Sequence, residues 1–156
     1  PLPHIQSTPK IHMRAKWDRF ICVDLDQDGK KEVLAEGRGG GVVLYCGGEE
    51  VYMTVITSQC FPYEIYENGI CIDGAGGAFS TGYNRLYPAK GAMYIERIAY
   101  MEVRENYVLD IPPYKIMDKG VTKEECEAYI EELVGGLTPL EWHDFTEENI
   151  DRYVVD

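Results

Sequence analysis

Short apolar runs separated by turn residues fill the chain from about residue 20 to about residue 111, and this pattern predicts a series of β-strands. Asn68-Gly69 lies between two such runs, at residues 63–66 and 70–73. Asn and Gly both tolerate the positive φ that a type I′ turn requires, so we expect a tight β-hairpin at this point.

Two further turns are predicted in the same way. Gly47-Gly48 separates apolar runs at residues 42–45 and 51–54, and Glu105-Asn106 separates runs at residues 98–101 and 107–109. Strands that follow one another in sequence and are joined by hairpins form an antiparallel meander rather than βαβ units.

After about residue 120 the spacing of the apolar residues becomes helical. Thr122 and Glu125 match a capping box, in which the side chain of each residue binds the backbone N–H of the other. Gly135 is expected to end this helix. The apolar face between these points consists of Cys126, Tyr129, Ile130, Leu133 and Val134.

The remaining C-terminal residues predict two more helical segments. Thr138-Pro139 is typical of the start of a short helical turn, and Phe145-Thr146 begins a last helical stretch in which Phe145 and Ile150 occupy hydrophobic-staple positions. The predicted fold class is therefore α+β, an antiparallel β-meander sheet with C-terminal helices packed on one face or end. Residues 1–14 are expected to form a loose leader, and residues 15–156 a single α+β domain.

The charge balance narrows the classes of partner. The chain holds 27 Asp and Glu residues against 15 Lys and Arg residues, a formal net charge of −12. Nucleic acids and anionic membrane surfaces attract the opposite charge, so neither is expected as a partner, whereas metal ions and basic protein surfaces are favoured. No apolar run approaches the ~18 residues that a membrane-spanning helix needs.

One segment carries specific chemistry: residues 24–32 have the pattern D-x-D-x-D-G-x-x-E. A tight loop turns alternate side chains inward, so three aspartates at alternate positions can converge on one point. The glycine that follows permits a sharp turn that exposes the next carbonyl to the same point, and the final glutamate closes the shell directly or through water. The candidate ligands are the carboxylates of Asp24, Asp26, Asp28 and Glu32 and the main-chain carbonyl of Lys30. Hard oxygen ligands in this number favour Ca²⁺ over Mg²⁺.

The apolar flanks of this loop predict strands, and Ala35 stands where an EF-hand loop has its last acidic ligand. The arrangement resembles the calcium loops of integrin-type FG-GAP repeats. It resembles more closely a calcium-loop domain of bacterial secreted proteins and lipoproteins, in which an apolar strand enters the same motif and a second strand leaves it. Residues 20–34 carry this resemblance, and the motif occurs once. The resemblance implies the same five ligands and an extracellular or cell-surface location.

Other signals are expected to be structural. A plain Asp-rich turn is the alternative for the acidic loop itself. The glycines of residues 37–41 lack the following helix of a phosphate-binding loop, and residues 78–82 resemble a nucleophile elbow only faintly, because a strand is predicted after them. His143 has an acidic neighbour but no evident nucleophile, and zinc is not expected.

The cysteines and tyrosines leave alternatives open. Five cysteines cannot all pair within one chain; Cys22 and Cys71 lie in apolar runs and are expected to be buried thiols, with one disulfide as the alternative. Most of the twelve tyrosines are expected to pack against the core, although some could form an aromatic surface for a protein or a glycan.

Three functions follow in order of preference. The first is a non-catalytic extracellular or cell-surface domain with one structural Ca²⁺, serving in binding or adhesion. The second is an intracellular (cytoplasmic) acidic protein that binds or inhibits a basic partner and needs no metal. The third is a hydrolase whose site is not recognisable in the sequence. The sequence does not indicate the oligomeric state.

Overall fold

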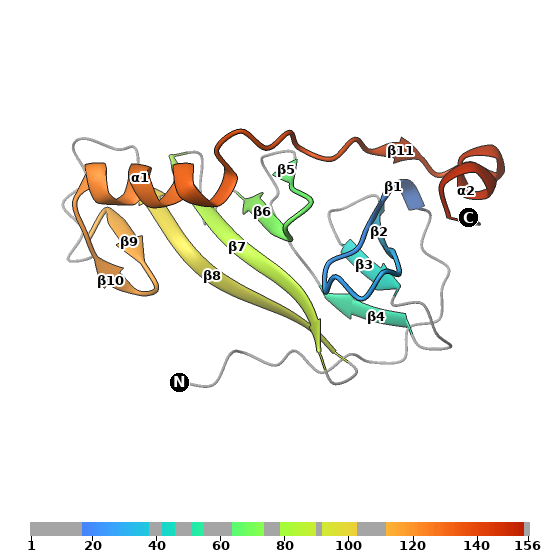
Figure 1. Ribbon diagram of the computed structural model, residues 1–156, viewed down its shortest axis with the longest axis horizontal. Coiled ribbons are helices and arrows are strands. Elements are labelled where there is room, and N and C mark those ends of the chain that lie inside the picture. The colour runs from blue at the N-terminus through green and yellow to red at the C-terminus, as the bar shows by residue number, and fades with distance from the viewer. Residues whose placement is uncertain are drawn as a thin grey trace.

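The computed structural model describes residues 17–37, 42–45, 51–54, 64–73, 79–89, 92–102 and 112–154. Within these ranges the chain forms two antiparallel sheets and two helices (Figure 1). The predicted α+β fold class is confirmed, with the strands divided between two sheets that we call sheet 1 and sheet 2. The leader predicted for residues 1–14 lies outside the described residues.

Sheet 1 has the strand order β11-β1-β2-β3-β4. Four of its strands follow one another in sequence, whereas β11 comes from the C-terminal part of the chain and pairs with β1, placing His143 opposite Phe20. The predicted pairing of residues 42–45 with 51–54 is confirmed, while Gly47-Gly48 itself lies outside the described residues. The strands are β1 (Trp17–Val23), β2 (Glu32–Gly37), β3 (Val42–Tyr45), β4 (Val51–Thr54) and β11 (His143–Asp144).

Sheet 2 is a meander in which every strand pairs with the next one in sequence, in the order β10-β9-β8-β7-β6-β5. Its two long central strands form the hairpin that crosses the middle of Figure 1. The turn predicted at Glu105-Asn106 lies outside the described residues. The strands are β5 (Glu64–Ile65), β6 (Ile70–Asp73), β7 (Ser80–Ala89), β8 (Ala92–Glu102), β9 (Tyr114–Ile116) and β10 (Lys119–Gly120).

The hairpin predicted around Asn68-Gly69 is confirmed, but its predicted type I′ turn is wrong. The Tyr66 N–H donates to the Ile70 carbonyl at 2.9 Å and the Gly69 N–H donates to the Tyr66 carbonyl at 3.0 Å, so residues 67–69 form a three-residue connection. Only its last residue, Gly69, has a positive φ, of 77°. Asn68 instead uses its side chain, which donates to the Leu133 carbonyl at 2.7 Å and so ties the hairpin to the following helix.

Helix α1 (Lys123–Val134) begins as the sequence predicts. Thr122 Oγ1 accepts from the Glu125 N–H at 3.2 Å and Glu125 Oε2 accepts from the Thr122 N–H at 2.8 Å, which confirms the capping box. The helix ends at Gly135, whose φ is −58°; the left-handed residue is the next one, Gly136, with φ 77°. Neither described helix is long and apolar enough to cross a membrane.

The helical turn predicted at Thr138-Pro139 is wrong, because residues 137–142 contain no helix. The Leu140 N–H donates to the Ile65 carbonyl of β5 at 2.7 Å, and Leu140 and Trp142 pack against the core. Burial and pairing with the β5 edge thus outweigh the local preference for a turn. Helix α2 (Glu147–Tyr153) follows its predicted N-terminus, where Thr146 Oγ1 accepts from the Asn149 N–H at 3.2 Å.

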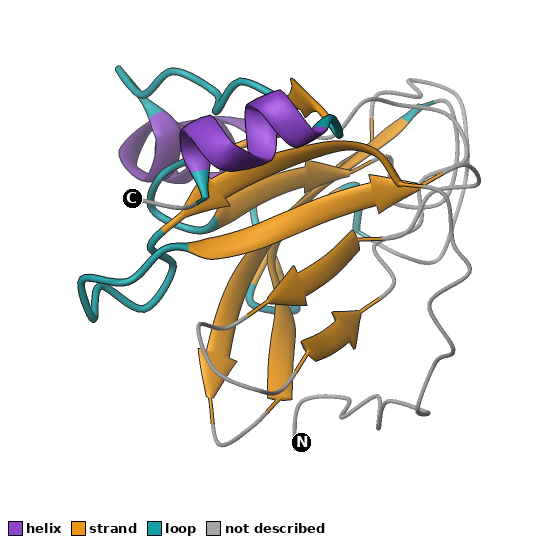
Figure 2. Ribbon diagram, turned by 90° about the vertical axis from the view of Figure 1, so that its right-hand side faces the viewer, coloured by secondary structure: helices purple, strands orange, loops and turns teal. Residues whose placement is uncertain are grey.

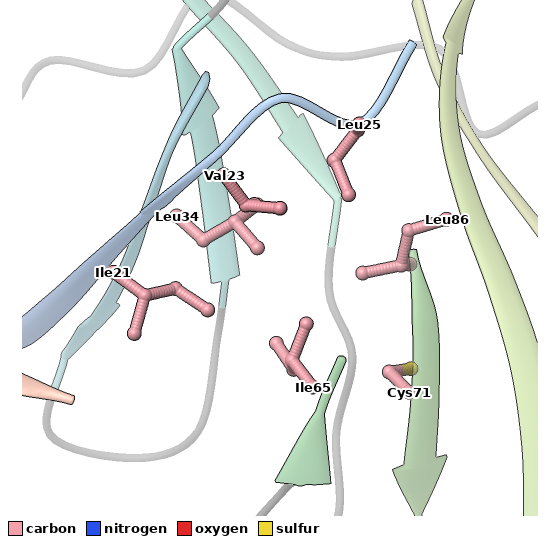
Figure 3. Packing of buried hydrophobic residues seen from close by; sticks show 7 residues of the cluster. All are labelled: Ile21, Val23, Leu25, Leu34, Ile65, Cys71 and Leu86. Atoms are coloured by element: carbon pink, nitrogen blue, oxygen red, sulfur yellow. The ribbon is translucent and has the colours of Figure 1, made fainter. Parts of the chain in front are cut away.

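The larger core cluster lies between the two sheets, as Figure 3 shows. Sheet 1 and the loop after β1 contribute one side of it, and sheet 2 the other. On β6, Cys71 belongs to this cluster, whereas the flanking Ile70 and Ile72 belong to a second cluster that includes residues of α1. The first cluster consists of Ile21, Val23, Leu25, Leu34, Ile65, Cys71 and Leu86.

Sheet 2 is therefore apolar on both faces, as alternation along β6 requires. Helix α1 covers one face, where Leu133 and Val134 pack against Ile70 and Ile98. Sheet 1 covers part of the other face. Figure 2 shows α1 lying across sheet 2, so the described part of the molecule has a helix layer and two sheet layers.

Candidate metal centre

The acidic segment is the loop that joins β1 to β2. The two strands pair in register up to Val23 and Glu32, which fixes both ends of the loop. Leu25, the second loop residue, is 9% exposed and belongs to the core cluster between the sheets (Figure 3). Since one apolar side chain is buried on an otherwise polar loop, the two aspartates that flank it are anchored close to the protein body.

The three aspartates of the loop converge. Asp24, Asp26 and Asp28 each offer a carboxylate oxygen, and these oxygens all lie within 4.8 Å of one another. Two oxygens bound to the same Ca²⁺ at about 2.3–2.6 Å lie at most about 4.6–5.2 Å apart, so this separation fits one calcium ion. Asp24 is half-buried and the other two are exposed. Within the described ranges, no other three His, Cys, Asp or Glu side chains form such a group.

Backbone amides hold these carboxylates in place. Asp24 accepts from the Asp28 N–H at 3.1 Å and from the Gly29 N–H at 2.9 Å. Asp26 also accepts from the Asp28 N–H, at 3.2 Å, and Asp28 accepts from the Lys30 N–H at 2.8 Å. Each carboxylate oxygen keeps a further lone pair. The loop therefore keeps a curled shape through its own hydrogen bonds, with Gly29 at φ 87° permitting the sharp turn.

Glu32 has a different environment from the aspartates. It is 3% exposed, and its Oε2 accepts from the Leu25 N–H at 2.6 Å. Burial raises the pKa of its carboxyl, the Leu25 hydrogen bond opposes that rise, and the three aspartates raise the pKa further. Glu32 is not one of the three converging groups. It lies at the base of the loop, where a nearby divalent cation would favour its ionised form.

Lys30 is exposed, and its ammonium lies 3.9 Å from Asp28 Oδ2. This pair is weak because both groups face water. The sequence-based analysis predicted the convergence of the aspartates but missed the anchoring by Leu25. A single leucine between two aspartates of a polar loop is the signal that could have revealed it.

The segments judged structural from sequence have structural positions. Gly37 ends β2, and the next described element is the antiparallel strand β3, so no helix N-terminus follows the glycines. Ser80 is the first residue of β7 and is buried, which differs from an exposed nucleophile between a strand and a helix. His143 stacks on Tyr153, with ring centroids 3.8 Å apart, and meets Phe20 edge-on.

The described cysteines are free thiols. Cys71 and Cys126 are buried and Cys22 is half-buried, while Cys46 and Cys60 lie outside the described residues. Burial raises the pKa of the Cys71 thiol to about 12, so this thiol stays protonated at neutral pH. These three cysteines thus behave as small apolar side chains.

No protein-family model, curated protein or solved structure matches this chain. The resemblance of residues 20–34 to calcium-loop families therefore depends on the acidic loop alone.

Proposed function

We propose that this chain is a non-catalytic extracellular or cell-surface domain in which the loop after β1 binds one structural Ca²⁺. The observation that carries the proposal is the convergence of Asp24, Asp26 and Asp28, whose oxygens lie within 4.8 Å of one another on a loop fixed at both ends. Carboxylates held this close repel one another, and a divalent cation removes that repulsion. The Lys30 carbonyl and Glu32, directly or through water, would complete the shell.

The proposed location follows from the availability of calcium. Extracellular modules bind Ca²⁺ with Kd values of about 10⁻⁴–10⁻³ M, a range that extracellular calcium fills. Two of the three aspartates are exposed, which suits a site of this strength. The similarity of the loop to those of bacterial secreted proteins and lipoproteins supports the same location.

The proposed task is binding or adhesion, with a protein or a glycan as the partner. Tyr87 of β7 and Tyr94 of β8 stack with their centroids 5.3 Å apart, and both are partly exposed. Stacked, partly exposed tyrosines offer a large apolar area with polar edges, which suits either kind of partner.

Thermal unfolding in calcium and in chelator tests the metal. In about 5 mM Ca²⁺ a site of this strength adds about 1–2 kcal/mol to the free energy of unfolding, which raises the melting temperature by several degrees. We expect a smaller rise in Mg²⁺, because Mg²⁺ gives up its waters reluctantly. An unchanged melting temperature in Ca²⁺ would refute the proposal.

The substitution Asp26→Asn locates the ion. The amide oxygen still accepts from the Asp28 N–H, but one negative charge is lost. We expect most of the calcium-dependent shift to disappear while the calcium-free protein becomes slightly more stable. Asp151→Asn on α2 is the matched control, since it removes one exposed carboxylate far from this loop in sequence and should leave the shift intact.

A second candidate function is an acidic surface for a basic protein. Helix α1 carries glutamates even in its last turn, which has no basic residue. Negative charge at a helix C-terminus opposes the helix dipole, so these side chains are placed at a cost to helix stability. The exposed glutamates are Glu124, Glu125, Glu127, Glu131 and Glu132.

The second candidate predicts capture of a basic protein that weakens steeply with salt. Replacing Glu131 and Glu132 with glutamine should weaken that capture several-fold, since rim charges act mainly on the association rate. The same pair of substitutions should stabilise α1 slightly. Binding to lysozyme or another basic protein that is unaffected by salt or by these substitutions would contradict this candidate.

A further inference from the structure

A hollow of about 270 Å³ opens on sheet 2, in a different sheet from the acidic loop. Strand β8 contributes residues 97–100, β9 contributes Lys115, and the turn between β9 and β10 contributes Met117 and Asp118. Figure 1 shows β9 and β10 beside β8, beneath α1. The volume suits a small organic molecule rather than a drug-sized one.

Two irregularities in neighbouring strands shape this hollow. On β7 and β8, Tyr83 pairs with Ala99 and Asn84 with Arg97, so Ile98 is an extra residue that forms a β-bulge. In the turn, Met117 and Asp118 have φ values of 47° and 65°, which side-chain-bearing residues adopt only at a cost. The Met117 N–H donates to the Ile98 carbonyl at 3.0 Å, so the bulge and the turn support each other.

The hollow is lined by two cations in a chain whose net charge is −12. Arg97 is held in place, with Nη2 3.2 Å from Asp73 Oδ2 and Nε 3.3 Å from Asn84 Oδ1. Lys115 is half-buried and makes no ion pair with a described carboxylate. With Asp118 included, the lining residues carry one net positive charge.

We propose that this hollow binds a small organic carboxylate. The carboxylate lies between Lys115 and the guanidinium of Arg97, where its single charge balances the single net charge of the lining residues. The apolar body of the ligand lies beside the Met117 side chain, which is 49% exposed. Apolar lining with a few placed charges is typical of small-molecule sites.

Titration with phenylacetate, followed by the amide and methyl signals of isotope-labelled protein, tests the proposal. We expect shifts confined to residues 97–100 and to Met117, with a Kd of roughly 1–10 mM, the range open to a ligand of this size. Phenylacetamide, which has the same shape without the charge, should bind at least several-fold more weakly. The Lys115→Gln variant should lose affinity for phenylacetate by about the same factor.

Lys119→Gln is the matched control, because Lys119 lies on β10 of the same hairpin and does not line the hollow. It should leave the Kd unchanged. Equal binding of phenylacetamide, an equal loss in both lysine variants, or shifts that avoid β8 would each overturn the proposal. Shifts of the same signals by inorganic phosphate at equal or lower concentration would also overturn it, in favour of an unselective anion site. The titration is run in chelator and in Ca²⁺, and its result does not depend on occupancy of the acidic loop.

Discussion

Gly69 shows how a single backbone position constrains this fold. Its φ is 77°, and a Cβ at this position would lie 2.8 Å from the Leu86 carbonyl oxygen. The Gly69 carbonyl also accepts from the Leu86 N–H at 2.8 Å, so the two residues cannot move apart without losing that bond. Glycine is required here for both its conformation and its size.

The substitution Gly69→Ala should therefore lower the free energy of unfolding by about 2–3 kcal/mol, from left-handed strain together with a backbone clash. Gly136→Ala is the matched control, because Gly136 has the same φ but a Cβ added there would meet nothing within 4 Å. It should cost only about 1 kcal/mol. Urea denaturation measures both, and equal losses would show that the clash at Leu86 is relieved by relaxation.

At the same scale, the sequence predicted the site only in part. The alternate spacing of Asp24, Asp26 and Asp28 was sufficient to predict their convergence, because that property depends on the loop alone. The burial of Glu32 and its hydrogen bond to the Leu25 N–H depend on how the loop packs against sheet 2. Such contacts between distant segments leave no local pattern in the sequence.

Among the secondary-structure elements, those defined by neighbouring residues were predicted best. The capping box of α1 and the Thr146 N-cap of α2 involve residues at most three positions apart, and both are confirmed. Residues 137–142 were predicted wrongly, because their conformation is set by the β5 edge and the core rather than by Thr138-Pro139. The turn type at Gly69 was missed since Asn68 binds α1.

The division of the strands into two sheets is a property of the whole molecule. Apolar runs predict strands but do not specify which strands share a sheet. The structure shows that Leu86 of sheet 2 is 1% exposed and packs in one cluster with Ile21 and Leu34 of sheet 1 (Figure 3). A core shared by both sheets couples their stabilities.

The Leu86→Ala variant tests this coupling. Removing this side chain should lower the free energy of unfolding by about 2–5 kcal/mol. Because the cluster joins the sheets, amides of β1 and β2 should lose hydrogen-exchange protection to the same extent as those of β6 and β7. A loss confined to sheet 2 would contradict a single cooperative unit. Exposed Val154, on the α2 side of the molecule, offers a control as Val154→Ala, which should change neither sheet.

The pairing of β11 with β1 has a consequence for synthesis of the protein. Strand β1 leaves the ribosome early, whereas His143 and Asp144, which cover its outer edge, are translated near the end. Until then the backbone groups on that edge are open to other polypeptides. A nascent chain would therefore need chaperone protection of its first strand until the C-terminal segment has docked.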